Sequence, residues 1–201
     1  MSGQFQNEDS FRQAEVGGWE WGDRVRAGDH GAFDALMERY KRPVLNFVYR
    51  MIGDAAEAED VAQEVFVRAY RAMLKPGFRR TTAKFSTWLF QVARNAALDC
   101  LRRRRRHPAS SLSVLESGGD ALPARQATAA EEAVAREAGA EIAAAIASLP
   151  EEQRTALILS EYEGLPDARI AAVMRCSAKS VEARLYRARH FLRERLRHLL
   201  E

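Results

Sequence analysis

Two groups of basic side chains in the sequence could bind a polyanion. Arginine occurs five times in succession at 102–106, and the stretch 177–200 holds seven bases against two acids. A guanidinium group donates several hydrogen bonds in a fixed geometry that suits phosphate oxygens. A helix C-terminus also favours cations, and a charge run can be a solvated face or a targeting signal, but five arginines exceed what a helix end needs. The two groups therefore indicate a phosphate-bearing partner.

Aromatic residues stand among bases in the segment before the arginine run. The rings are Phe78, Phe85, Trp88 and Phe90, and the bases are Arg79, Arg80, Lys84 and Arg94. Unpaired bases of single-stranded DNA can stack on such rings while the cations hold the phosphates. Aromatic residues at helical spacing can equally fill a core. The pattern alone leaves these two interpretations equal.

A third candidate surface is acidic. Five acids fall between Asp54 and Glu64, beside the apolar Val61, Val65 and Phe66. Acids in the first turn of a helix suit its dipole. The charge pattern by itself favours a solvated helix face over a partner surface.

The sequence lacks motifs of catalysis and of metal binding. It contains no glycine-rich phosphate loop, no H-E-x-x-H and no serine nucleophile elbow. Cys100 and Cys176 lie far apart without a C-x-x-C pair, so neither a disulfide nor a zinc site is expected. His190, Glu194 and His198 recur every four residues, but one exposed helical stripe rarely closes a coordination sphere. We expect no enzyme activity, no metal site and no cofactor.

Length and composition indicate a globular protein of one large or two small domains. The chain has 201 residues, of which 47% are hydrophobic, and a formal net charge of +3. No apolar stretch approaches the length of a membrane span, and the N-terminal residues lack the apolar segment of a signal peptide. The expected protein is soluble and cytoplasmic, with no membrane insertion of its own.

Apolar periodicity predicts an all-α fold of two small helical domains joined by a flexible linker. Apolar residues recur at three and four between 23 and 106 and again from 131 to the end, whereas strand patterns are almost absent. Residues 1–22 are expected to be a loose tail, which Trp19 and Trp21 could attach to the first domain. Residues 107–130 mix Ser, Gly, Pro and Ala and predict the linker.

Capping signals divide the first domain into five helices. A short helix should end near Gly28, the second near Tyr40, and Pro43 should lie in the first turn of the third. The fourth should run from Asp54 to about residue 74. The fifth should be capped by Ser86 and carry the arginine run in its last turn.

The end of the chain has the form of a helix-turn-helix. A short helix with Ile170 and Val173 is followed by a turn at Cys176 and a longer helix capped by Ser177. Polar side chains near the start of the longer helix, followed by arginines, suit base edges and phosphates in a major groove. We favour DNA recognition over a merely solubilised helix.

Four stretches together resemble, in order and spacing, the extracytoplasmic-function (ECF) group of bacterial sigma factors in the sigma-70 family. They are DAAEAEDVAQEVFVRAYRA, KFSTWLFQVARNAALDCLRRR, SLPEEQRTALILSEYEGL and IAAVMRCSAKSVEARLYRARHFLRERL. The resemblance implies a region 2 domain at 23–106 and a region 4 domain at 131–201. It also implies core RNA polymerase, promoter DNA as duplex and as non-template single strand, and an anti-sigma factor as partners.

The resemblance implies three sets of contact residues. The surface for core polymerase would comprise Asp60, Gln63, Glu64 and Phe66. The element that opens and reads the minus-ten DNA would comprise Phe78, Arg79, Arg80, Lys84, Phe85, Trp88, Gln91, Arg94, Asn95, Arg102, Arg103, Arg104 and Arg105. The reader of the minus-thirty-five element would comprise Lys179, Ser180, Glu182, Ala183, Arg184, Tyr186 and Arg187.

One alternative function remains open from the sequence. A stand-alone helix-turn-helix regulator would bind operator DNA without polymerase and use its first domain to sense a ligand. The first domain offers basic and aromatic surface rather than the lining of an apolar cavity, which speaks against this alternative.

Glu182 departs from the family pattern, because it would repel phosphate although it can accept a hydrogen bond from cytosine.

Overall fold

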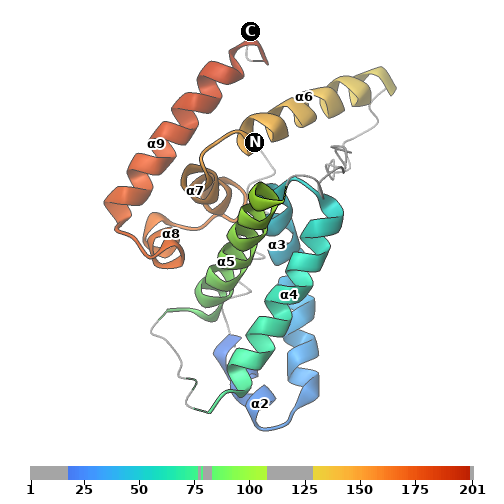
Figure 1. Ribbon diagram of the computed structural model, residues 1–201, viewed down its shortest axis with the longest axis vertical. Coiled ribbons are helices and arrows are strands. Elements are labelled where there is room, and N and C mark those ends of the chain that lie inside the picture. Colours follow the sequence, from blue (N-terminus) through green and yellow to red (C-terminus); the bar gives the residue numbers. More distant parts are fainter. Residues whose placement is uncertain (1–17, 77, 79–82, 108–128, 200–201) are drawn as a thin grey trace.

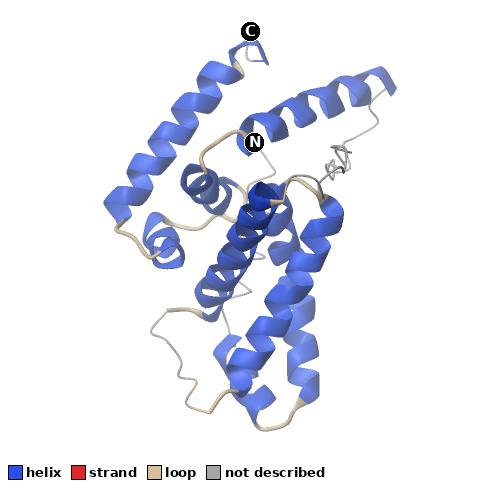
Figure 2. Ribbon diagram, in the orientation of Figure 1, coloured by secondary structure: helices blue, strands red, loops and turns tan. Residues whose placement is uncertain are grey.

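The computed structural model describes residues 18–76, 78, 83–107 and 129–199, and every regular element in these ranges is a helix (Figures 1 and 2). The predicted all-α class is confirmed. None of the helices in these ranges is long and apolar enough to cross a membrane. In chain order the elements are α2 (Gly18–Arg26), α3 (His30–Ile52), α4 (Ala55–Leu74), α5 (Phe85–Arg106), α6 (Ala129–Ala147), α7 (Glu151–Glu161), α8 (Asp167–Met174), α9 (Ala178–Arg195) and the short 3-10 helix η2 (Arg197–Leu199).

Local capping sets the boundaries of the helices in the first domain, which comprises α2 to α5. The Asp29 carboxylate accepts a hydrogen bond from the backbone N–H of Ala32 at 3.2 Å, where α3 begins. Asp54 does the same for Glu57 at 2.9 Å, where α4 begins. Between them Gly53 ends α3 with a φ of 79°, a conformation that residues with a Cβ rarely adopt. The chain therefore turns within a few residues, and α4 packs against α3.

Two predicted helix starts in the first domain are wrong. The chain does not begin a new helix at Pro43, because α3 runs unbroken from His30 to Ile52. Pro43 lacks the N–H that would bond the carbonyl of Arg39, but buried apolar residues before and after it hold the helix together. Ser86 does not cap α5 either. The helix begins one residue earlier, and Ser86 is buried, where its hydroxyl accepts a hydrogen bond from Arg169 at 2.6 Å.

The boundaries of the predicted tail and of the predicted linker also differ from those in the structure. Residues 18–22 belong to α2 rather than to a tail, and the chain from residue 129 onward belongs to α6 rather than to a linker. Most of both predicted segments lies outside the described residues.

The second domain contains the predicted helix-turn-helix in α8 and α9. Ser177 caps α9 by accepting a hydrogen bond from the N–H of Ser180 at 3.2 Å, as expected. Arg175 makes the turn in the left-handed conformation, with a φ of 53°. Val181, Leu185 and Ala188 form the buried stripe of α9.

The two domains share one apolar core in this structure. Phe47 and Phe90 of the first domain meet edge to face with ring centroids 5.4 Å apart. They lie in the same buried cluster as Leu159 and Ile170 of the second domain. Helix α7 packs on α3 and α8 packs on α5, so that α5 lies between α4 and the second domain (Figure 1). The sequence predicted two domains but not this contact between them.

Candidate nucleic-acid interface

The aromatic residues expected to bind single-stranded DNA form one cluster at the start of α5. Trp88 lies 5.4 Å from both Phe78 and Phe85, measured between ring centroids, and Trp19 of α2 joins them. Phe85 is only 3% exposed and Phe90 is fully buried, so these two rings are core residues. Phe78 and Trp88 are half-buried at the edge of the cluster. Core packing is therefore confirmed for Phe85 and Phe90, and stacking on single-stranded DNA stays a prediction for Phe78 and Trp88.

Of the basic residues that stand among these rings in the sequence, the structure describes Lys84 and Arg94. Lys84 is exposed at the first boundary of α5. Arg79 and Arg80 lie outside the described residues. The exposed candidates of this part of the chain are therefore Lys84, at the start of α5, and Asn95, about two turns beyond Trp88.

Two other candidates on α5 face the second domain rather than solvent. The side-chain amide of Gln91 donates a hydrogen bond to the carbonyl of Ala172 at 2.8 Å. Arg94 forms an ion pair with Glu152 at the start of α7, and its side chain is 13% exposed. A contact with the minus-ten DNA would need these side chains to face solvent, and in this arrangement the second domain covers them, because helical periodicity identifies a face but not what covers it.

The arginine run ends α5 as predicted, but its members have different partners. Arg104 forms an ion pair with Glu57 at 2.7 Å and donates a hydrogen bond to the carbonyl of Ile52 at 3.1 Å. Arg105 pairs with Glu151 of the second domain at 2.8 Å. Arg102 and Arg103 are exposed, and Arg102 pairs with Asp99 on its own helix. Three of the candidates, Arg102, Arg103 and Arg105, thus have exposed side chains, although Arg105 pairs with the second domain, whereas Arg104 joins the end of α5 to α4.

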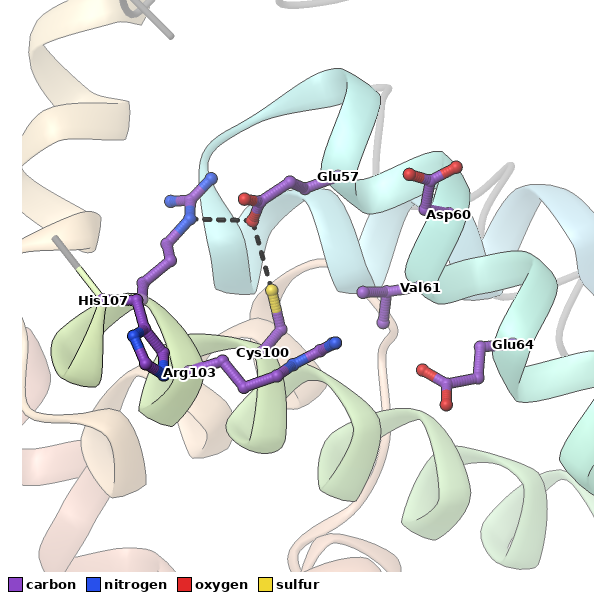
Figure 3. Close-up of a pocket in the computed structure, with 8 residues that line it drawn as sticks. Glu57, Asp60, Val61, Glu64, Cys100, Arg103 and His107 are labelled. Carbon is purple, nitrogen blue, oxygen red and sulfur yellow. Dashed lines mark hydrogen bonds and ion pairs between the residues drawn. The ribbon is translucent and has the colours of Figure 1, made fainter. Parts of the chain in front are cut away.

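A groove of about 360 Å³ separates the acidic face of α4 from the end of α5 (Figure 3). Asp60 and Glu64 line one wall, and Arg103 and His107 line the other. At its floor the thiol of Cys100 donates a hydrogen bond to Glu57 at 3.1 Å. Burial, together with that carboxylate, raises the pKa of Cys100 to about 11, so the thiol stays protonated at neutral pH. Candidate residues for polymerase and for DNA therefore meet along one groove.

Three of the four candidates for the polymerase surface are accessible. Asp60 and Gln63 are exposed, and Glu64 is half-exposed in an ion pair with Arg68 at 2.7 Å. The expectation that Phe66 lies on this surface is corrected, because its side chain is 4% exposed and belongs to the core. Since α4 turns by about 100° per residue, Phe66 points to the opposite side from the acids.

The recognition helix α9 presents most of its predicted residues to solvent. Lys179, Glu182, Tyr186 and Arg187 are exposed, and Ser180 and Ala183 are half-exposed. Tyr186, at 72% exposure, stacks on His190 with ring centroids 6.4 Å apart. The expectation that Arg184 is presented to DNA is also corrected for this arrangement. Its side chain is only 20% exposed and lies against α7 of its own domain, where it pairs with Glu152 at 3.2 Å.

Sequence reasoning missed the residues that join the domains. The guanidinium of Arg154 is buried and donates hydrogen bonds to the carbonyl of Met51 in α3, at 2.7 Å, and to those of Leu149 and Ala147 in its own domain. Burial lowers its pKa from the ordinary value, and Glu151 opposes that shift. A signal was present in the sequence, because a lone arginine stands directly before the apolar stretch TALIL.

A metal site does not form on the last helix. Glu194 pairs with Arg197 at 2.7 Å, while His198 pairs with Glu141 of α6 at 2.8 Å. No three His, Cys, Asp or Glu side chains in the described part of the chain gather as metal ligands would.

Two family models match the chain, one in each domain. The model of Sigma-70 region 2 matches residues 36–107, and that of Sigma-70, region 4 matches residues 139–192. The first match covers nearly all of α3 to α5. The second covers most of α6 to α9.

Curated relatives match over nearly their whole length. The RNA polymerase sigma-H factor of Pseudomonas aeruginosa is 40% identical over 89% of this chain and 93% of its own. The ECF RNA polymerase sigma-E factor of Escherichia coli K12 is 35% identical over the same shares. The ECF RNA polymerase sigma factor SigW of Bacillus subtilis is 32% identical over 88% of this chain and 95% of its own.

Solved structures share the fold at lower identity. CnrH, in complex with the cytosolic domain of CnrY, aligns with a TM-score of 0.63 at 23% identity, covering 89% of this chain and 96% of its own. The sigma factor RpoE of Bartonella quintana, in complex with the anti-sigma factor NepR, aligns with a TM-score of 0.61 at 22% identity, covering 82% of this chain and 96% of its own.

Proposed function

The chain belongs to the ECF RNA polymerase sigma factors, and we propose that it binds core polymerase through α4, opens the minus-ten DNA with α5 and reads the minus-thirty-five DNA with α9. One observation carries the proposal. Each of the two matched regions coincides with one helical domain, and each domain exposes residues of the chemistry that its role requires.

Core polymerase would contact the exposed edge of α4. Asp60 and Gln63 project into solvent beside the groove, and Glu64 lies next to them. The acids favour a basic partner surface, and such complementarity mainly sets the rate of encounter and the choice of partner. Phe66 would support this edge from the core without touching the partner.

Promoter opening would take place at the start of α5. The half-buried rings of Phe78 and Trp88 offer stacking faces to an extruded base, and the exposed Lys84 and Asn95 of the same segment offer hydrogen-bonding groups to the strand. Arg102 and Arg103 lie at the other end of the same helix, where they would hold phosphates. The start of α5 would thus recognise the DNA sequence, and the end of α5 would contribute affinity that does not depend on sequence.

The exposed face of α9 would enter the major groove of the minus-thirty-five element. Lys179, Glu182, Tyr186 and Arg187 lie on this face. Glu182 is suited to accept a hydrogen bond from the N4 amino group of cytosine. The arginines farther along α9 would hold phosphates.

Binding of DNA by both domains would require the domains to separate. Glu152 holds Arg94 of α5 and Arg184 of α9 at the same time, and Glu151 holds Arg105. Arg94 and Arg105 pair with glutamates of the second domain, so separation of the domains would release both for DNA, whereas the Arg184–Glu152 pair lies within the second domain. The arrangement described here would therefore be a closed one, and core polymerase would stabilise an open one.

We place the chain in the cytoplasm, with polymerase, as a factor without enzymatic activity of its own. An anti-sigma factor is the expected regulatory partner, since members of the family are held inactive in that way. The closed arrangement would be the natural target, because a partner that bound both domains at once would keep the arginines covered.

Promoter binding with and without core polymerase tests the proposal. A labelled duplex promoter should bind the chain weakly alone and tightly, with sequence preference, when core enzyme is added. Tight binding to the same duplex without polymerase would instead support the stand-alone regulator.

A further inference from the structure

Helix α2 lies outside the matched region 2 and contacts both ends of the segment between α4 and α5. Its Trp19 donates a hydrogen bond from Nε1 to the carbonyl of Ala83 at 2.9 Å, just before α5 begins. At the other end, Arg26 donates a hydrogen bond from Nε to the carbonyl of Met73 at 3.2 Å, near the end of α4. One helix thus spans the gap between the two helices that enclose the aromatic cluster.

The ring of Trp19 also packs inside that cluster. It meets Phe85 edge to face at 5.2 Å and lies 5.7 Å from Trp88 and 5.9 Å from Phe78. The guanidinium of Arg26 lies 5.7 Å above the ring of Phe78. Each of the two half-buried rings assigned to the minus-ten DNA therefore has a neighbour on α2.

The position of α2 is itself fixed by close packing. A Cβ at Gly22 would lie 3.2 Å from the sulfur of Met73, so this glycine allows α2 to approach α4 closely. Val25, nearly two turns from Trp19 along the same helix, is buried at 4% exposure. Because α2 cannot shift freely, its contacts to Ala83 and Phe78 fix those groups in place.

We propose that Trp19, assisted by Arg26, is a positioning residue for promoter opening, which holds Phe78, Trp88 and the start of α5 in the geometry that receives the minus-ten strand. The inference rests on the proposed function of α5. Its physical basis is preorganisation, because aromatic rings and a backbone that are already fixed lose less conformational entropy when an extruded base binds. Trp19 itself need not touch DNA.

Trp19→Phe is the variant of choice, because it removes the indole N–H and keeps most of the ring packing. The measurement is the affinity of core polymerase with this chain for a fluorescent non-template strand that spans the minus-ten element of a promoter mapped from transcript starts. We expect about fivefold weaker binding, the factor that corresponds to one neutral hydrogen bond. Affinity for core polymerase and for a minus-thirty-five duplex should stay unchanged. A general loss of folding would instead lower both of these affinities.

Trp21→Phe provides the matched control on the same helix. Trp21 is also half-buried against the core, but its cation partner is Arg39 of α3, on a different side from the minus-ten cluster. This variant should bind the strand as the unchanged chain does. Equal losses in both variants, or no loss in Trp19→Phe, would overturn the inference. Failure of the unchanged holoenzyme to bind the strand would instead contradict the proposed function.

A second measurement needs no variant. The indole proton of Trp19 should exchange slowly with solvent, by NMR, both in the free chain and in the chain bound to the single strand. If strand binding makes that proton exchange freely, the hydrogen bond to Ala83 does not hold in the working state, and Trp19 is not a positioning residue.

Discussion

Glu163 is a buried carboxyl that follows α7, and burial makes the stability of the described fold depend on its protonation. Its side chain is 5% exposed, and burial raises its pKa to about 8, although Arg50 of α3 opposes the shift. The neighbouring Tyr162 packs its ring under the guanidinium of Arg50 at 3.8 Å. The carboxyl therefore lies where the two domains meet.

The raised pKa predicts a stability that falls as the pH rises. Between about pH 4.5 and pH 8 the folded chain keeps a proton on Glu163 that the unfolded chain releases, so the free energy of unfolding decreases through this window. Glu163→Gln removes the ionisable group, and the variant should have a higher unfolding midpoint at pH 7.5 and a flatter pH profile. Circular dichroism melts from pH 5 to pH 8.5 measure both, with the exposed Glu161→Gln as control. Parallel profiles for the unchanged chain and Glu163→Gln would show that Glu163 ionises normally.

The last turn of α5 combines a structural arginine with arginines available to DNA. Arg104 is 24% exposed in its side chain and joins α4, the end of α3 and α5 through Glu57, Asp54 and the carbonyl of Ile52. Arg102 is 59% exposed and forms an ion pair with Asp99 on its own helix. The sequence indicated one uniform basic patch, whereas the structure gives its members different roles.

Substitutions within this turn should separate stability from DNA affinity. Arg104→Ala should lower the free energy of unfolding by about 1–3 kcal/mol, since it leaves Glu57 and the backbone carbonyl without their charged partner. Arg102→Ala should change stability by less than about 0.5 kcal/mol and lower the salt dependence of promoter binding by about one unit of slope. Urea unfolding and binding titrations at several salt concentrations measure the two effects. A large loss of stability in Arg102→Ala with none in Arg104→Ala would reverse the assignment.

Local patterns predicted the helices well and their surroundings poorly. The Asp54 and Ser177 caps, the end of α4 and the helix-turn-helix follow from neighbouring residues, so the sequence was sufficient for them. Pro43 was misplaced because buried contacts along α3 outweigh the missing N–H. Arg94 and Arg184 lie on the predicted helix faces, but what covers those faces depends on residues far away in the sequence.

The arrangement of the two domains links the two helices that are proposed to bind DNA. Among the described residues, Glu152 alone forms ion pairs with both Arg94 and Arg184. It therefore links α5, α7 and α9. An affinity measured on the closed chain is reduced by the fraction of molecules that are open. Weakening this link should therefore increase DNA binding by the free chain without adding any contact to DNA.

Glu152→Gln is expected to shift the chain toward the open arrangement. Because Glu152 is 44% exposed, solvent screens its pairs, and we expect only about a two- to fivefold higher affinity of the free chain for a minus-ten single strand. Small-angle X-ray scattering should show a larger radius of gyration. Glu161→Gln is the matched control, because it loses the same charge and an ion pair to Arg189 that lies within the second domain. If both variants bind and scatter as the unchanged chain does, Glu152 does not hold the domains together.

Transcription by core polymerase tests most directly that this chain supplies promoter specificity through its two domains. Purified bacterial core enzyme would be mixed with the chain and with DNA fragments that carry promoters mapped after its overexpression, and run-off transcripts would be measured. The account predicts transcripts that start at defined positions, that require the chain, and that disappear when either the minus-ten or the minus-thirty-five element is replaced. Absence of chain-dependent transcripts across these promoters, or transcripts that survive replacement of both elements, would contradict it.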